Sequence, residues 1–343
     1  MNALKNLFIL NLTLFEAGPV QTTELKATNN DLSPEMRTFY SKQLLENLKP
    51  DLVYNQFAEK YPIPPHNGKT IQFRKMNKFA PATTPLVEGV TPAGTALDFT
   101  EMLVTVYQYG AYAVLSDRVQ VETIDPLLAT VIEAFSDQAG ETLDVLDRDV
   151  LCGGTQVWYA PNVAANGVES ENTTRDTMNS TALINMNVIY DAARMLKRAG
   201  VKTRDGSYIC IVHPDVAKDI KRTAEWQDMV KYQHPEKIYK GEIGMIDNIR
   251  FIESNNAPIW KDGGVAIYGT VVFGKGAYGE IEITEEGLEI IVKQVGSGGA
   301  DDPLNQRGSA GWKKSHAVAR LSEEAIVRIE STSSSGDSAE ANV

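Results

Sequence analysis

The sequence predicts an α+β protein whose mixed sheet carries helices on its faces. Three observations lead to this prediction. Residues 68–74 alternate apolar and polar side chains as a half-buried strand does, and residues 126–151 place apolar side chains on one face of a long helix. Residues 201–273 follow the pattern strand, helix, then further strands. That order is typical of a sheet covered by helices.

Composition places the chain among ordinary globular proteins. Its 343 residues allow about two domains, and 43% of them are apolar and 23% charged. The 45 acidic residues exceed the 33 basic ones by 12, which argues against a surface whose main role is to neutralise phosphates or anionic lipid. No run approaches the ~20 apolar residues that span a bilayer, so we expect no membrane partner.

The first 62 residues are predicted to form an extended arm with one helical stretch. Ser33 and Pro34 open that stretch, and Pro50 ends it. The apolar residues 7–15 resemble a short signal sequence, but Asn11 and Thr13 interrupt them and no small-residue cleavage site follows. We therefore interpret them as a docking arm.

A long hairpin is predicted next. Residues 68–74 form its first strand, residues 81–94 its irregular tip and residues 97–119 its return strand. The tip is much longer than the usual hairpin loop of about 2–5 residues. Two interpretations stay open: the hairpin projects and packs on something else, or two strands of an ordinary sheet are joined by a loose loop.

One long helix follows the hairpin. Asp125 and Pro126 are a cap and first-turn pair, and apolar residues trace one face until Gly153 and Gly154. The predicted helix over 126–151 is roughly 38 Å long. Its opposite face carries the acidic residues Glu133, Asp137, Glu141, Asp144 and Asp147. We interpret this stripe as solvated; the alternative is contact with basic residues of another subunit.

The remaining elements complete the sheet. We expect helices over 185–198 and from Pro214 through Trp226, strands over 208–212, 249–253 and 264–273, and a final pair of strands over 317–321 and 325–329. Residues 162–180 are polar and predicted to form a surface loop. The serine-rich residues 332–343 are predicted to be an unstructured tail.

Catalytic patterns are weak throughout. The four histidines lack the spacing of a zinc site, and the Gly-Lys step at 274–275 lacks the rest of a phosphate-binding loop. The two cysteines cannot form a disulfide framework, although a single disulfide between them stays open. A thiol hydrolase using Cys152 or Cys210 with His213 is an alternative, but free cysteines are more often small buried apolar residues. We predict a protein that is not an enzyme and holds no cofactor or metal.

Residues 295–313 resemble the C-terminal signature of tailed-bacteriophage major capsid proteins, in the group typified by the phage N-four coat protein. The segments 85–92, 212–215 with Trp226, and 241–253 are similar to the same family in the same order. The resemblance covers about residues 35–330.

This resemblance implies a Hong-Kong-97-type capsid fold. The expected parts are an N-terminal arm (1–62), an extended-loop hairpin (63–118), a peripheral domain (119–200) with the spine helix 126–151, an axial domain (201–300), a C-terminal signature loop with return strands (301–331) and the tail (332–343). It also implies self-assembly into hexamers and pentamers of an icosahedral head that encloses double-stranded DNA. An encapsulin-like compartment is the alternative within the fold.

The resemblance implies partners as well. They are further copies of the chain, a separate scaffolding protein because the chain begins almost directly at the arm, a portal protein, packaged DNA bound by non-specific contact and, optionally, a decoration protein. The expected location is the virion, with assembly in the bacterial host cytoplasm. Arg307 and Lys313 beside Trp312 could bind nucleic acid, but we favour packing between subunits. The expected subunit contacts are Phe73, Leu86, Glu88, Gly89, Thr91, Pro92, Asn305, Gln306, Arg307, Trp312 and Lys313.

Overall fold

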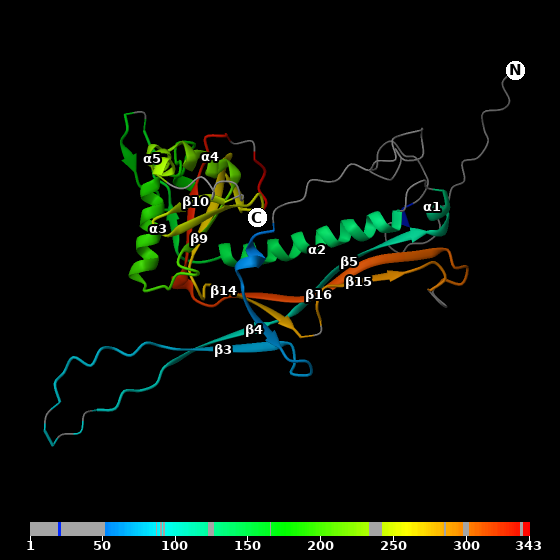
Figure 1. The fold of residues 1–343 in the computed structure, drawn as a ribbon, viewed down its shortest axis with the longest axis horizontal. Coiled ribbons are helices and arrows are strands. Elements are labelled where there is room, and N and C mark those ends of the chain that lie inside the picture. The colour runs from blue at the N-terminus through cyan, green and yellow to red at the C-terminus, as the bar shows by residue number, and fades with distance from the viewer. Residues whose placement is uncertain are drawn as a thin grey trace. The chain divides into compact units, whose positions relative to one another are not determined.

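The computed structural model describes residues 20–21, 52–86, 88–89, 91, 93–122, 127–164, 166–232, 242–284, 286–297, 302–336 and 339–343. The chain divides into two compact units (Figure 1). Unit 1 comprises residues 1–49, 108–142 and 288–314, and unit 2 comprises residues 50–107, 143–287 and 315–343. The helical stretch predicted before Pro50 lies outside the described residues.

A mixed seven-stranded sheet forms the centre of unit 2, as the sequence predicted. Its order is β10-β11-β9-β13-β17-β6, with β12 paired to β13. The strands are β6 (Val157–Tyr159), β9 (Tyr208–Val212), β10 (Glu242–Ile246), β11 (Ile249–Glu253), β12 (Ile259–Asp262), β13 (Val265–Phe273) and β17 (Ile326–Ser331). Strand β11 runs parallel to β9 and β6 parallel to β17, whereas β13 is antiparallel to both β9 and β17. All five residues of β9 are buried, which explains its continuous apolar sequence.

Helices cover one face of this sheet. They are α3 (Met186–Arg198), α4 (Pro214–Arg222) and α5 (Ala224–Tyr232). Leu196, Ile220 and Trp226 from these helices share one buried cluster with Phe251 of β11. The predicted single helix through Trp226 is in fact two helices that break at Thr223, whose backbone N–H donates to the carbonyl of Ile220.

The other face of the sheet is covered by the end of α2 (Leu127–Cys152) and by η2 (Tyr54–Phe57). Cys152 and Tyr54 pack there with Ile211 and Phe273. Helix α2 confirms the predicted long helix. Its acidic stripe is only partly solvated, because Asp144 and Asp147 are fully buried; the solvated interpretation was wrong for these two residues.

Strands β3 (Thr70–Met76) and β4 (Phe99–Thr105) form a separate two-stranded sheet. Seven residue pairs join them, and the hairpin extends away from the rest of unit 2 (Figure 1). The predicted projection is therefore confirmed, and packing of the hairpin on another molecule stays a prediction. The predicted return strand over 97–119 is wrong as one element: it breaks at Val106 and continues as β5 (Tyr107–Ser116) in another sheet and then as α1 (Asp117–Glu122).

The signature region forms a long strand, β16 (Arg307–Arg320), where we expected a loop. In unit 1, residues 309–313 of β16 pair with β15 (Glu289–Lys293), and β5 lies between β16 and β1 (Val20–Gln21). In unit 2, residues 317–320 pair with β14 (Tyr278–Ile283), which pairs with β2 (Glu59–Ile63). The predicted pairing of 317–321 with 325–329 is wrong, because β16 and β17 belong to different sheets.

The loop predicted over 162–180 contains a short hairpin of β7 (Asn162–Val163) and β8 (Glu169–Ser170), followed by η3 (Arg175–Thr177). A last 3-10 turn, η6 (Glu323–Ala325), precedes β17. The prediction of an unstructured tail is wrong for its described residues. Ser333 Oγ and Ser334 N donate to Asp219 Oδ2 at 2.9 and 2.8 Å, and Asn342 Oδ1 accepts from Ile259 N at 2.7 Å.

Candidate assembly interface

The hairpin exposes a series of large apolar side chains. Met76, Phe79, Leu86, Leu97, Phe99 and Leu103 are each between 43% and 79% exposed. Several large apolar side chains left in water on one element often mark a surface that another molecule covers. The hairpin surface, meaning these six residues, is therefore a candidate contact site.

One face of the hairpin is used within the chain itself. Ile71, Phe73, Met102 and Val104 pack with buried residues of β2 and β14. The rings of Phe73 and Tyr61 meet edge to face at 5.1 Å between centroids. Phe73, predicted as a subunit contact, thus helps to anchor the hairpin to unit 2.

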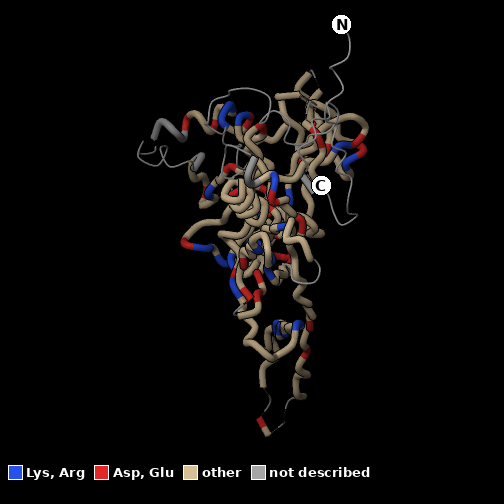
Figure 2. The backbone as a smooth tube through the Cα atoms, turned by 90° about the vertical axis from the view of Figure 1, so that its right-hand side faces the viewer, with Lys and Arg blue, Asp and Glu red and all other residues tan. Residues whose placement is uncertain are grey.

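The tip residues predicted as contacts are exposed where the structure describes them. Leu86 is 79% exposed, and Glu88, Gly89 and Thr91 are exposed as well, whereas Pro92 lies outside the described residues. Gly89 has a φ of 76°, a left-handed conformation that favours glycine. Figure 2 shows that the charged residues of the hairpin gather near its base and leave its distal part mostly uncharged.

The described residues of the signature segment, residues 295–313, instead form contacts within unit 1. The Arg307 backbone N–H donates to Asp302 Oδ2 at 2.7 Å, and Lys313 Nζ lies 3.0 Å from Glu289 Oε2. Trp312 is only 4% exposed, and its indole Nε1 donates to Gln138 Oε1 at 3.1 Å. The side chain of Trp312 therefore packs within the chain, which corrects its predicted place between subunits.

Two further predicted contacts, Asn305 and Gln306, precede that tryptophan in sequence. Asn305 and Gln306 are exposed, and Asn305 has a left-handed φ of 52°. The carbonyl of Gln306 accepts from Asp117 N at 3.0 Å. Gly311 lets β5 approach β16 closely, because a Cβ there would lie 2.8 Å from the carbonyl oxygen of Ala111. Much of the signature is thus explained by internal turn and packing requirements.

Neither cysteine can serve as a reactive thiolate. Burial raises the pKa of Cys152 to about 12, against the smaller lowering effect of Arg328, and burial also raises the pKa of Cys210. His213 caps α4 by accepting from Asp215 N at 3.2 Å, and burial lowers its pKa. Neither cysteine therefore provides the activated nucleophile that a thiol hydrolase would need.

One cluster of residues arranged like an acid–base site is fully buried. His316 Nε2 lies 2.8 Å from Asp147 Oδ1, and His316 Nδ1 lies 3.3 Å from Glu280 Oε1, within the described part of the chain. All three side chains are at most 1% exposed, so no substrate reaches them. This buried His–Asp–Glu cluster joins α2, β14 and β16 within unit 2. Among the described residues, no helix is long and apolar enough to span a membrane, and no group of three or more acidic, histidine or cysteine residues is arranged to hold a metal.

Comparison with known proteins decides the family. The family model described as phage capsid protein matches residues 99–329, about two thirds of the chain. The chain belongs to the phage capsid protein family. This match confirms the resemblance seen in the sequence, and it makes the protein a structural component of a bacteriophage shell rather than an enzyme or an encapsulin-like compartment. No curated protein matches the sequence.

Solved phage capsids share the fold. The capsid of Cyanophage P-SCSP1u superposes with a TM-score of 0.65 at 13% identity, covering 93% of this chain and 100% of that one. A chain of Mycobacterium phage Che8 gives a TM-score of 0.60 at 13% identity, covering 88% and 98%. The head structure of Helicobacter pylori bacteriophage KHP40 gives 0.61 at 11% identity, covering 90% and 99%. The capsid protein therefore has the Hong-Kong-97-type fold that the resemblance implied.

Five residues of the hairpin surface were not predicted from the sequence, namely Met76, Phe79, Leu97, Phe99 and Leu103. The signal was present in Met102-Leu103-Val104, where three successive apolar residues give the strand apolar side chains on both faces. When only one face of such a strand packs on its own chain, the apolar side chains of the other face are left for another molecule to cover.

Proposed function

We propose that this capsid protein assembles into hexamers and pentamers of an icosahedral head that encloses the double-stranded DNA genome of a tailed bacteriophage. One observation carries the proposal beyond the family: the hairpin surface leaves six large apolar side chains in water. A subunit that must join several neighbours around rings of five and six needs such a surface, since heterologous contacts that close by rotation build rings.

The proposed partners follow from the family resemblance and the charge. They are a separate scaffolding protein, a portal protein and, optionally, a decoration protein, with assembly in the host cytoplasm before the head encloses its genome. A net charge of −12 argues that any contact with packaged DNA is weak as well as non-specific, because acidic residues repel phosphates.

Electron microscopy of the purified protein, alone and with its scaffolding partner, tests the proposal. We expect hollow shells or rings of five and six subunits. Dispersed monomers under both conditions would contradict it. Nuclease treatment of particles isolated from infected cells tests DNA enclosure separately, since enclosed DNA survives the treatment and DNA on the outer surface is digested.

A further inference from the structure

Strand β15 lies at an edge of the sheet in unit 1. One side of it pairs with residues 309–313 of β16, and no strand of the described chain pairs with its outer side. Alternate residues of an edge strand point their backbone N–H and C=O groups away from the sheet, so this edge can accept a strand from another chain. Strand β15 is therefore a candidate site for strand pairing.

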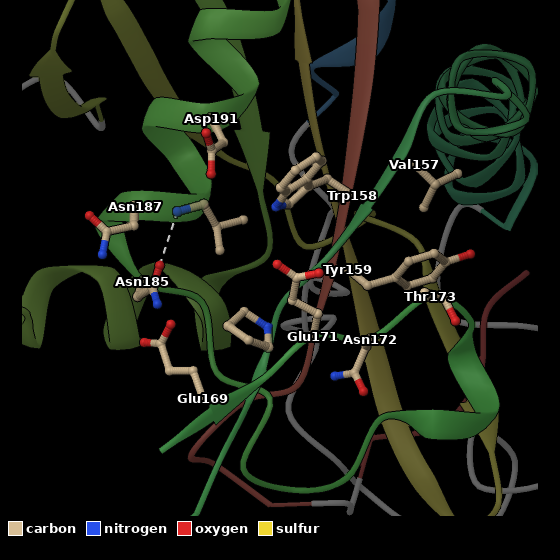
Figure 3. A pocket seen from close by; sticks show the side chains of 12 residues that line it. Val157, Trp158, Tyr159, Glu169, Glu171, Asn172, Thr173, Asn185, Asn187 and Asp191 are labelled. Atoms are coloured by element: carbon tan, nitrogen blue, oxygen red, sulfur yellow. Dashed lines mark hydrogen bonds between the residues drawn. The ribbon is translucent and has the colours of Figure 1, made fainter. Parts of the chain in front are cut away.

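Three other strands that end a sheet carry features that discourage such pairing. Strand β2 contains Pro62, which has no N–H to donate. Strand β10 has a register shift between Glu242 and Gly244. Strand β6, which lines the pocket drawn in Figure 3, has only three residues. Strand β15, by contrast, has five residues in regular register, with no proline and no glycine among them.

The apolar side chains of β15 are only partly covered. Leu288, directly before the strand, is 46% exposed, and Ile290 and Val292 are each 39% exposed. These three residues alternate in sequence, so they share one face of the sheet. Trp312 and Ala310, which stand directly opposite Ile290 and Val292 on β16, are buried. The apolar face is thus covered at β16 and exposed at β15, which indicates that another molecule covers it there.

The sequence of β15, Glu-Ile-Ile-Val-Lys, is complementary to itself when two copies run antiparallel. A register centred on Ile291 sets Glu289 of each copy opposite Lys293 of the other. In the same register Ile290 faces Val292. Opposite charges and apolar pairs at directly facing positions both stabilise antiparallel strands. A slip of two residues in either direction sets Glu289 opposite an apolar residue and loses both charge pairs, so the charges select one register.

We propose that the outer edge of β15 pairs with β15 of a second copy of the chain, in the antiparallel register centred on Ile291. A twofold axis perpendicular to the sheet then relates the two copies, and their sheets become continuous. The backbone hydrogen bonds supply the attraction, and the side chains supply the specificity.

This contact is isologous, because the same strand serves both copies. A ring of five has no twofold axis, so the contact joins subunits of different rings. It rests on the proposed assembly of rings into a shell and assigns to that shell one contact between rings, separate from the hairpin surface. Two paired strands of five residues each bury little area, so the contact acts together with the others of the shell.

A cysteine on the proposed twofold axis tests the register. In I291C the two introduced residues face each other at a Cα separation of about 4.5–5.5 Å, which a disulfide can span. After mild oxidation of assembled protein, we expect most I291C chains to run as dimers on a non-reducing denaturing gel. L288C is the matched control, because Leu288 is more exposed but the register holds its two copies about 20 Å apart. L288C should therefore stay monomeric, as should the wild type, whose own two cysteines are buried.

Charge reversal tests the pairing of Glu289 with Lys293. Glutamates face one another in I291C/K293E, and lysines do in I291C/E289K, so we expect each to give at least about threefold less dimer than I291C. When the two variants are mixed and one carries a tag, mixed dimers should exceed both self-dimers, because each glutamate then faces a lysine. I291C/K275E reverses an exposed lysine outside β15 and should match I291C.

Light scattering gives the protein concentration at half-assembly, and K293E without the cysteine should raise it about threefold. Assembled particles in which I291C stays monomeric, or in which L288C forms dimers as readily, would overturn the contact while the proposed function stands. Equal yields of mixed dimers and self-dimers would also overturn it. I291C dimers from a protein that forms neither rings nor shells would overturn the proposed function alone, and the absence of both dimers and particles would overturn both.

Discussion

The hairpin and the seven-stranded sheet belong to the same unit, but the sheet buries its apolar residues whereas the hairpin exposes many of them. Every residue of β9 is buried between helices on one face and the end of α2 on the other. On the hairpin, Leu86 and Leu103 are 79% and 69% exposed. A two-stranded hairpin is marginally stable by itself, whereas a covered sheet supplies its own core. The sheet therefore stabilises the subunit, and the hairpin surface is available to neighbours.

The largest expected effect comes from the sheet. Phe251 is fully buried on β11 and meets Trp226 edge to face at 5.3 Å between centroids. Phe251→Ala should lower the free energy of unfolding by about 3–5 kcal/mol, because it removes buried surface and leaves a cavity. Urea unfolding measures the change, and Ile249→Val, expected to cost about 0.5–1.5 kcal/mol, is the graded control. A loss below about 1 kcal/mol for Phe251→Ala would mean that the sheet is not the stabilising region.

A smaller effect, with a distinct pH dependence, is expected from the buried His–Asp–Glu cluster. Burial lowers the pKa of His316, but hydrogen bonds with Asp147 and Glu280 outweigh it, so the pKa is raised overall. Burial raises the pKa of Asp147, against the lowering effect of His316. The charge of Asp147 in turn raises the pKa of Asp144, although burial is the larger cause, and Lys60 lies 3.9 Å from Glu280.

Both shifts have the same sign for stability. A histidine whose folded pKa is raised stabilises the fold fully below its unfolded pKa of about 6.5, and this contribution is lost as pH rises through the folded pKa. The raised pKa of Asp147 means that its ionisation destabilises the fold as pH rises from about 3.9 through the folded value. The cluster thus holds protons more tightly in the folded chain than in the unfolded chain, and its contribution to stability should decrease with increasing pH.

His316→Gln should remove the part of the decrease in stability that begins near pH 6.5. It should also lower the free energy of unfolding by about 1.5–3 kcal/mol at pH 6, since a hydrogen bond to a charged group is lost. Thermal unfolding across pH 5 to 9 measures both quantities. His66→Asn removes an exposed histidine at a left-handed φ of 67°, which asparagine tolerates, and should leave the profile unchanged. A His316→Gln profile parallel to that of the wild type would show that the cluster does not titrate.

The smallest effect on stability should come from the hairpin surface. Leu103→Asn should change the free energy of unfolding by no more than about 0.5 kcal/mol, because the side chain is 69% exposed. It should nevertheless raise the concentration at half-assembly about fivefold or more, since buried interface anchors contribute over about 1 kcal/mol each. Val343→Asn, an exposed apolar residue outside the hairpin, is the control. Unchanged assembly by Leu103→Asn would remove this leucine from the contact surface.

Local patterns determined much of the fold. Three patterns each predicted the right element, because burial follows directly from residue spacing: the apolar run 208–212, the alternating residues 68–74 and the long amphipathic face from Leu127 onward. The signature run also indicated the family correctly. These features depend on contacts close in sequence or on one strongly apolar face.

Only the tertiary structure decided which polar and aromatic residues are buried. From the sequence, Asp144 and Asp147 belong to a solvated stripe, but in the fold residues 55, 280 and 316 pack against this part of α2. Trp312 was predicted to contact another subunit, but its indole N–H donates to Gln138 within the chain. The sequence determined the elements and the family, since these depend on periodicity and local motifs. The partners of a buried charge are far apart in sequence, so only the folded chain reveals them.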